Sequence, residues 1–418
     1  MAGIEIMAPA GAFDSLSAAL RAGADSVYFG AGNLNMRARA TVNFQIDDLP
    51  KVARFCHAAS AKCYLTLNTI IFDNEIDEMR RLCDAACEAG IDAVIATDFA
   101  VIHYAHSIGM PVHISVQSGI SNFEAVRFYA QYADAVVLAR ELHLSQIRDI
   151  VAAVVREKIT GPSGELIKIE IFAHGALCVA VSGRCGMSLS VYNSSADRGA
   201  CFQNCRRRYK ITDEETGREL VIDNHYVMSP KDLCTIGFLD QIIASGVAIL
   251  KLEGRGRSAD YVSTVVSCYR EAADACVYGS YSQDKVANWV ERLGTVFNRG
   301  FWHGGYYLGE NLEQWSASGN SRATMRKIHL GRVTRYFPKL QVAELSVEAQ
   351  NLESGCEILI TGNTTGAMQF KVDEIRVDGK PVKVAEKPVC ASIPVPDKVR
   401  TNDQVYLLIE RKFGEPAE

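Results

Sequence analysis

The sequence has 418 residues, of which 48% are hydrophobic and 22% are charged, and its formal net charge is -5. This balance is typical of a globular protein with a buried core, and it excludes wholesale disorder and a fibrous fold. The acidic balance also excludes a globally cationic nucleic-acid binder, so any contact with nucleic acid must come from local basic patches. The length is sufficient for two or three domains.

The N-terminal segment lacks the features of a secretory signal, because no basic residue precedes Arg21 and no long apolar run is present there. We therefore expect a cytoplasmic protein. An uncharged stretch at 99–123 is long enough to consider as a membrane span, but His103, His106 and Pro111 interrupt it, and we expect no membrane contact. Thirteen cysteines in such a protein favour free thiols or metal ligands over disulfides.

Residues 1–285 alternate between short runs rich in β-branched residues and longer amphipathic stretches. This alternation is typical of strands joined by helices, and eight strands in one series favour a (β/α)8 barrel of the TIM-barrel type. The predicted strands cover 5–9, 26–30, 63–68, 93–98, 112–117, 135–140, 169–174 and 248–254, with helices such as 75–89 and 144–155 between them.

Alternate residues of the predicted strands differ in polarity, which predicts which side faces the helices. Apolar positions such as Leu65 and Leu67 are expected to pack under the helices. The opposite face would give the barrel a polar interior, and such an interior indicates either a buried ion-pair network or a ligand site. Its members are Glu5, Thr66, Asn68, His113, Ser115, Gln117, Glu170, His174, Lys251 and Glu253.

The alternation ends in a segment rich in glycine and aromatic residues near residue 300, so that 286–330 is predicted to be a connector with some helix. From 331 to 418, short alternating runs are separated by turn signals such as Asp378-Gly379. These runs predict a small all-β domain, either a barrel or a sandwich.

Four cysteines follow the seventh predicted strand within 28 residues, with the spacing C-x6-C-x15-C-x3-C. This spacing lacks the paired C-x2-C motifs of structural zinc sites, and nearby glycines would let the backbone wrap around a bulky group. We therefore favour an iron–sulfur cluster, with zinc or unligated thiols as the alternatives. The four residues are Cys178, Cys185, Cys201 and Cys205.

Two basic segments are candidate RNA contacts. One is the run at 206–210 beside the cysteines, and the other is 314–343, which contains six basic residues, three aromatic residues and no acidic residue. Cations suit phosphates and aromatic rings suit unstacked bases, although a solvated surface is the alternative. The predicted RNA-binding residues are Arg206, Arg207, Arg208, Arg326, Lys327 and Arg332.

Several motifs resemble those of the collagenase-like peptidase family U32 over about residues 1–310. They include Glu-Ile-Phe-Ala-His-Gly-Ala-Leu-Cys at 170–178, Ser-Gly-Arg-Cys-Gly-Met-Ser at 182–188 and Lys-Leu-Glu-Gly-Arg at 251–255. The C-terminal β-domain is similar to the extension found in the tRNA-hydroxylating branch of that family. The resemblance implies that the four cysteines hold a [4Fe–4S] cluster. It also implies oxygen-independent 5-hydroxylation of the tRNA wobble uridine, with prephenate as the co-substrate linked to the hydroxyl group.

A small polar co-substrate would need residues at the carboxyl ends of the barrel strands. We expect His174, Gln117 and Asn68 to hold it there. Arg140 and Arg255 are expected to clamp its carboxylates, unless Arg140 is instead paired with a neighbouring carboxylate such as Glu141.

Glu253 follows the last predicted barrel strand and has two interpretations. It is either a general acid or base, or the ion-pair partner of Lys251 or Arg255. The sequence contains neither a His-Glu-x-x-His nor a Gly-x-Ser-x-Gly motif, so the peptidase interpretation lacks a catalytic set.

The leading expectation is a tRNA-hydroxylating enzyme with two domains. Three alternatives stay open: hydroxylation of ribosomal RNA or a quinone precursor, a collagenase-like peptidase, and a noncatalytic RNA-binding protein with a structural metal. The sequence indicates no particular protein partner.

Overall fold

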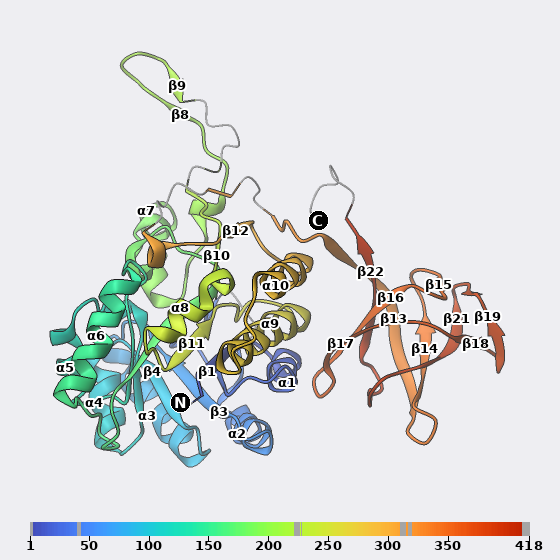
Figure 1. Ribbon diagram of the computed structural model, residues 1–418, viewed down its shortest axis with the longest axis horizontal. Coiled ribbons are helices and arrows are strands. Elements are labelled where there is room, and N and C mark those ends of the chain that lie inside the picture. Colours follow the sequence, from blue (N-terminus) through green and yellow to red (C-terminus); the bar gives the residue numbers. More distant parts are fainter. Residues whose placement is uncertain are drawn as a thin grey trace.

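The computed structural model describes residues 3–39, 43–220, 226, 228–309, 315–316 and 320–411. A helix-covered barrel forms one part of the molecule and an all-β region lies beside it (Figure 1). Among the described residues, no helix combines the length and the apolar character that a membrane crossing requires.

Eight parallel strands form the barrel, and it is closed because β11 pairs with both β1 and β7. The eight strands predicted from the sequence are confirmed, with ends that differ by a few residues. They are β1 (Glu5–Ala10), β2 (Ser26–Gly30), β3 (Lys62–Leu67), β4 (Ala93–Ala96), β5 (Val112–Ile114), β6 (Ala135–Val137), β7 (Lys168–Gly175) and β11 (Ile249–Leu252).

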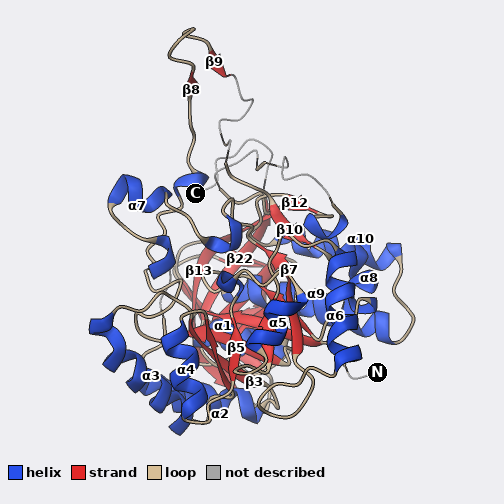
Figure 2. Ribbon diagram, turned by 90° about the vertical axis from the view of Figure 1, so that its left-hand side faces the viewer, coloured by secondary structure: helices blue, strands red, loops and turns tan. Residues whose placement is uncertain are grey.

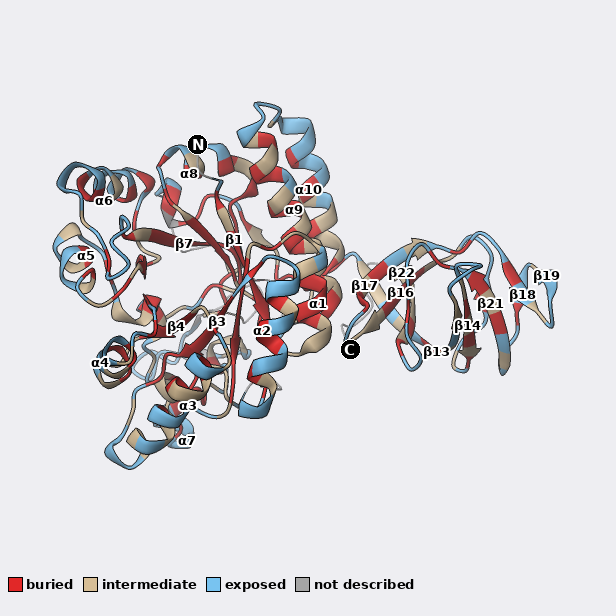
Figure 3. Cartoon of the chain, turned by 90° about the horizontal axis from the view of Figure 1, so that it is seen from below, coloured by how far each residue is buried: buried red, intermediate tan, exposed pale blue. Residues whose placement is uncertain are grey.

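Helices surround the strands, and their inward faces are buried while their outer faces are exposed (Figures 2 and 3). Leu65 and Leu67 belong to the same apolar core as the helices, as predicted from the strand pattern. The helices are α1 (Phe13–Arg21), α2 (Leu49–Ala58), α3 (Ile76–Glu88), α4 (Phe99–Ser107), α5 (Phe123–Tyr129), α6 (Leu144–Glu157), α8 (Leu239–Ala244), α9 (Ala259–Val277) and α10 (Gln283–Thr295).

The barrel interior combines apolar and charged side chains. Met7, Tyr28 and Ile95 belong to a small apolar cluster there. Beside this cluster, Lys251 and Glu170 are 5% and 0% exposed and form an ion pair of 2.7 Å between Nζ and Oε1. This part of the polar interior is therefore a buried ion pair, because each charge has its counter-ion within hydrogen-bonding distance.

A long excursion separates β7 from β11 and rises from the carboxyl ends of the strands. It contains α7 (Met187–Tyr192), the hairpin of β8 (Ile211–Thr212) and β9 (Glu219–Leu220), and β10 (Asp232–Cys234). The hairpin projects far from the barrel (Figure 1). β10 returns to pair antiparallel with β7 and is extended by β12 (Phe301–Trp302).

The C-terminal region is an antiparallel sheet, which confirms its predicted all-β character. The pairing order is β17-β16-β22-β13-β14-β21-β18-β19, and β15 (Leu352–Glu353) pairs separately with β20 (Val384–Ala385). The sheet comprises β13 (Met325–Phe337), β14 (Val342–Val347), β16 (Glu357–Gly362), β17 (Gly366–Lys371), β18 (Ile375–Val377), β19 (Lys380–Val382), β21 (Val389–Pro394) and β22 (Gln404–Glu410).

The β16–β17 hairpin packs against α1 and α9 of the barrel. Its turn approaches α1 so closely that a Cβ atom on Gly366 would lie 2.8 Å from the backbone nitrogen of Ala18. Gly366 also has a φ of +70°, a conformation that favours glycine. The Ser17 hydroxyl donates to the Asn363 carbonyl at 2.6 Å, so the contact is both tight and directional.

Candidate functional site

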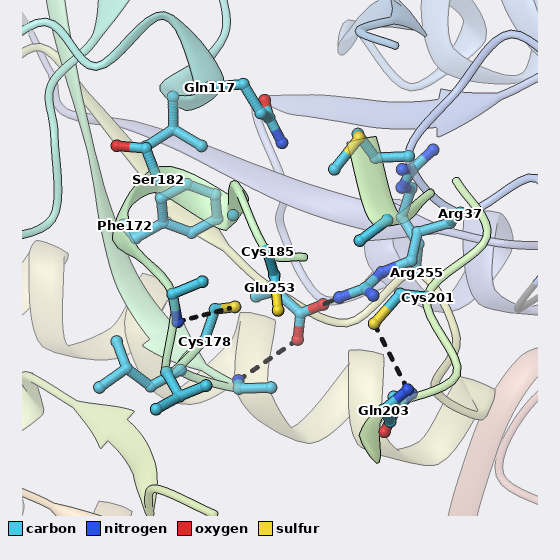
Figure 4. Close-up of a pocket in the computed structure, with 18 of the residues that line it drawn as sticks. Arg37, Gln117, Phe172, Cys178, Ser182, Cys185, Cys201, Gln203, Glu253 and Arg255 are labelled. Carbon is cyan, nitrogen blue, oxygen red and sulfur yellow. Dashed lines mark hydrogen bonds and ion pairs between the residues drawn. The ribbon is translucent and has the colours of Figure 1, made fainter. Parts of the chain in front are cut away.

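A cavity of about 570 Å³ opens at the carboxyl ends of the barrel strands (Figure 4). The strand ends contribute one side of its lining and the excursion after β7 contributes the other. The predicted residues that line it are Asn68, Gln117, Cys178, Cys185, Cys201, Cys205, Arg140, Arg206, Glu253 and Arg255.

The four cysteines of the excursion all line this cavity. Three of them have the same local geometry, because a backbone N–H two residues later donates to the sulfur at 3.4 Å. The pairs are Ala180 to Cys178, Met187 to Cys185, and Gln203 to Cys201. Such N–H donors stabilise a thiolate, which is the form of cysteine that binds a metal.

The fourth cysteine is electrostatically coupled to the other three. Burial raises the pKa of Cys205 to about 11 against the opposing effect of Arg206, and negative charge on Cys178, Cys201 or Cys185 would raise it further. Negative charges on neighbouring thiolates repel one another, and a cation bound between them offsets this repulsion. The four sulfurs therefore suit a shared metal group.

Glu253 is held by a partner that the sequence analysis did not predict. Its Oε1 accepts a hydrogen bond from Arg37 Nη2 at 3.0 Å, and its Oε2 accepts one from the Ala176 amide at 3.3 Å. The predicted pairing with Lys251 or Arg255 is wrong. Burial alone would raise the pKa of Glu253, but Arg37, Arg257 and Arg140 outweigh it and lower the pKa to about 2. Glu253 is therefore a carboxylate at neutral pH.

Arg255 is 6% exposed and lies on the floor of the cavity. Its Nη1 donates to Thr66 Oγ1 at 2.7 Å and to Asn35 Oδ1 at 3.1 Å, and burial lowers its pKa to about 10. A Cβ atom on Gly30 would lie 2.8 Å from the same Nη1. The glycine at the end of β2 therefore gives the guanidinium room.

Arg140 lies over the ring of Phe172, with 3.8 Å between the guanidinium carbon and the ring centroid. Its Nη1 donates to the Ala176 carbonyl at 3.1 Å. The alternative pairing with Glu141 is not what the structure describes, since Glu141 Oε1 accepts from the Ser182 amide at 3.4 Å.

Asn68 and Gln117 belong to one hydrogen-bonded group in the cavity wall. Asn68 Nδ2 donates to Ser115 Oγ at 3.2 Å and to Gln117 Oε1 at 3.4 Å, and its Oδ1 accepts from the Met36 amide at 3.3 Å. Gln117 lies in the short helix η3 (Val116–Ser118) and not in the predicted strand.

The expected position of His174 in the cavity is wrong. The residue is 3% exposed and packs against the rings of Tyr261, Tyr269 and Phe301, outside the cavity lining. A register irregularity in the β7–β11 pairing occurs beside it, and β10 pairs with it from the other side. Burial lowers the pKa of His174 to about 3, so its imidazole is neutral.

The described cavity lining is predominantly cationic. Sequence reasoning missed Arg37 because it lies in the aperiodic segment between β2 and α2, and it gave no role to Arg257 or Arg299. The basic lining residues are Arg37, Arg140, Arg206, Lys251, Arg255, Arg257 and Arg299, against the acidic residues Glu141 and Glu253. This balance favours an anionic ligand.

The first basic segment divides into an internal residue and two surface residues. Arg206 donates to the Leu177 and Pro230 carbonyls at 2.6 and 2.5 Å and to Ser229 Oγ at 2.9 Å. These three acceptors occupy its guanidinium, so Arg206 joins the cysteine loop to the segment before β10. The prediction that Arg206 is free to bind a phosphate is therefore wrong. Arg207 and Arg208 are exposed, as an RNA contact requires.

The second basic segment is also largely used within the chain. Lys327 Nζ binds Asp260 Oδ1 at 2.7 Å and Ser258 Oγ at 3.1 Å, which joins β13 to the start of α9. Arg332 Nε lies 3.6 Å from Glu348 Oε1, and Arg326 is only half-exposed. The expectation that Lys327 is available for RNA is therefore not met, since its charge is neutralised between the two parts of the molecule.

Comparison with known proteins connects this site to a family. The chain is 51% identical to a protein named collagenase from Porphyromonas gingivalis W83, over 98% of each chain. It is 33% identical to tRNA hydroxylation protein P1 of Bacillus subtilis, over 71% of this chain and 69% of that protein. It is also 34% identical to the 23S rRNA 5-hydroxycytidine C2501 synthase of Escherichia coli, over 66% of this chain and 40% of that protein.

A family model adds the extent of the shared region. The family model described as "Peptidase family U32" matches residues 11–317, which include seven of the eight barrel strands, all four cavity cysteines and the excursion after β7. This range is most of the chain, and the sequence resemblance pointed to the same family. The chain belongs to peptidase family U32.

Proposed function

We propose that this protein is an iron–sulfur-dependent RNA-modification enzyme. Its proposed reaction is oxygen-independent 5-hydroxylation of the tRNA wobble uridine, with prephenate as the small carboxylate co-substrate. The observation that carries the proposal is the placement of four cysteines on the wall of a cationic cavity at the barrel mouth. The names of relatives that modify tRNA and ribosomal RNA support an RNA substrate.

The cysteine geometry supports a cluster over a single zinc ion. Tetrahedral zinc with Zn–S bonds of about 2.3 Å needs sulfurs about 3.8 Å apart. Of the four described cysteines, no three have sulfur atoms within 4.8 Å of one another. The wider separation leaves room for a larger group, and a [4Fe–4S] cluster in this position would supply electron transfer or a Lewis-acidic iron.

The arginines of the cavity would bind the carboxylates of the co-substrate. Arg140 and Arg255 are held by backbone and side-chain acceptors, so their guanidinium groups are positioned before a ligand arrives. Such positioning reduces the entropy lost on binding. Glu253, with a pKa of about 2, is too weak a base for proton abstraction at neutral pH, and we assign it to orienting Arg37.

The RNA would have to reach the cavity across its rim. Phe202 lies in the chain between the lining residues Cys201 and Gln203, and its exposed ring lies 4.9 Å from the exposed ring of Tyr192, measured between centroids. The guanidinium carbon of Arg207 lies 5.3 Å from the centroid of the Tyr192 ring. Exposed rings beside a cation are suited to an unstacked base and its phosphate. This rim is therefore the proposed entry point for the uridine.

A peptidase is the second candidate, favoured by the name of the collagenase relative that matches almost the whole chain. The cavity offers it little support. His174 lies outside the cavity lining, and none of the described residues that line the cavity is a histidine that could act as a base beside the cysteines.

The deciding experiment is nucleoside mass spectrometry of RNA from cells with and without the gene. We expect 5-hydroxyuridine derivatives in tRNA to disappear without the gene and to return with the wild-type chain or with Cys87→Ser, an exposed cysteine of α3. Cys178→Ser is expected not to restore them. Unchanged tRNA with a missing ribosomal modification would transfer the proposal to ribosomal RNA. Unchanged RNA together with gelatin cleavage by the purified chain would overturn it in favour of the peptidase.

A further inference from the structure

Three potential metal ligands meet at the opposite end of the barrel from the cavity. They are His57 at the end of α2, Cys63 near the start of β3, and Asp92 just before β4. α2 and β3 lie at the far side of the barrel from the projecting β8–β9 hairpin in both Figures 1 and 2. This end is remote from the cysteines of the excursion.

The three ligand atoms form a small triangle. His57 Nε2 lies 3.0 Å from Asp92 Oδ2, Cys63 Sγ lies 3.3 Å from the same oxygen, and Sγ and Nε2 are 3.9 Å apart. Zinc bonds of about 2.0–2.3 Å at tetrahedral angles would put such atoms about 3.3–3.7 Å apart. The observed separations bracket this range, so small side-chain adjustments would seat one ion.

The arrangement is not that of a catalytic triad. In a triad the histidine uses one ring nitrogen for the nucleophile and the other for the carboxylate. Here Nε2 faces both Cys63 and Asp92. Cys63 is also 0% exposed, so no substrate carbonyl could reach its sulfur. Convergence of three different donors on one point is instead what a metal ion requires.

We propose that His57, Cys63 and Asp92 form a zinc site with an open fourth position. The His57 side chain is 47% exposed, so a water molecule can complete the coordination from solvent. Thiolate and imidazole ligands favour zinc over magnesium or calcium. The ion would link the end of α2 to the starts of β3 and β4. This is the amino-terminal end of the barrel strands, where side chains contribute to stability and not to catalysis.

Zinc binding at this site must release a proton. Without an ion, the buried Cys63 thiol carries its proton and donates it to Asp92 Oδ2 at 3.3 Å. Binding of Zn²⁺ replaces that proton on sulfur and releases it to solvent, with no change of oxidation state. The affinity should therefore increase with pH.

Zinc K-edge X-ray absorption of the full chain, loaded with zinc and passed through a desalting column, tests the proposal. This measurement is specific to zinc, so iron at the other cysteines does not contribute. We expect one sulfur, one imidazole nitrogen and lighter oxygen ligands around zinc. A shell of four sulfurs would place the zinc at the cavity cysteines and would overturn the proposal, as would the absence of bound zinc.

Thermal unfolding with and without added zinc provides a second arm. We expect zinc to raise the Tm of the wild-type chain and of His103→Ala, an exposed histidine of α4, but not that of His57→Ala. His57 is half-exposed, so its replacement should leave the fold intact. An equal Tm increase in His57→Ala would overturn the assignment. The RNA-modification test does not depend on this site, so the two proposals can fail separately.

Discussion

Arginines at the barrel mouth and in the β-domain are held in contrasting ways. Arg255 is 6% exposed and donates to two side-chain oxygens, with a glycine making room for it. The Arg332 side chain is 56% exposed and has Glu348 at 3.6 Å. A buried charge is destabilising when it loses a hydrogen-bonding or ion-pair partner, whereas an exposed charge is screened by water. The cavity should therefore be sensitive to single substitutions, and the β-domain surface should tolerate them.

The largest effect is expected for Lys251→Met, which removes the counter-ion of Glu170 in the barrel interior. An unpaired buried carboxylate should lower the free energy of unfolding by about 3–5 kcal/mol. Urea unfolding measures this change. The double variant Lys251→Met with Glu170→Gln should recover much of the loss, and a single variant as stable as the wild type would contradict the buried-pair account.

Arg255→Ala should be the next most damaging change. Loss of a charge-assisted contact worth roughly 2–3 kcal/mol would lower kcat/KM for the co-substrate roughly 30- to 150-fold. Arg255→Lys keeps the charge but not the fork of donors and should recover little. Arg332→Ala is the matched surface control. Full activity and full co-substrate affinity in Arg255→Ala would remove this residue from the site.

His174 predicts a pH effect on stability. Its pKa is about 3 when folded and about 6.5 in an unfolded chain, so between these values the unfolded chain binds a proton that the folded protein excludes. The stabilisation is therefore complete above pH 6.5 and decreases as the pH falls toward 3. Urea unfolding should show a loss of about 2 kcal/mol from this residue between pH 7 and pH 5.

The matched comparison for this pH effect is His174→Gln against His103→Gln, an exposed histidine. The first should flatten the pH dependence between pH 7 and pH 5, and the second should leave it as in the wild type. Identical pH profiles of stability for the wild type and His174→Gln would show that folding does not lower the pKa of His174.

The smallest effects on stability are expected for two ion pairs of the β-domain, Lys327 with Asp260 and Arg332 with Glu348. Lys327→Ala breaks the partly buried pair with Asp260 between β13 and α9 and should cost about 1 kcal/mol. Arg332→Ala should change stability by less than about 0.5 kcal/mol. Thermal unfolding compares the two. A larger effect of Arg332→Ala would reverse the contrast between buried and exposed charges.

The barrel was predictable because its strands carry a strong local signal. Apolar and polar residues alternate in β3, and Cys178 follows β7 at the end where barrel sites lie. Both features depend on neighbours in sequence.

The missed or misplaced residues depend on contacts between distant segments. Arg37 meets Glu253 across 216 positions of sequence, His174 is displaced where the β7–β11 register changes, and Arg206 turns inward toward carbonyls. A run of charged residues in the sequence does not show whether each side chain points to solvent or into the protein. Such positions can be assigned only once the strands have been brought together.

The central claim is that Cys178, Cys185, Cys201 and Cys205 hold an iron–sulfur cluster at the mouth of the barrel. Iron and acid-labile sulfide analysis of anaerobically purified protein tests it most directly. The account predicts about four of each per chain, as in a [4Fe–4S] cluster, and their loss in Cys201→Ser but not in Cys87→Ser. Protein that restores tRNA hydroxylation while containing no iron, or zinc alone at these cysteines, would contradict it.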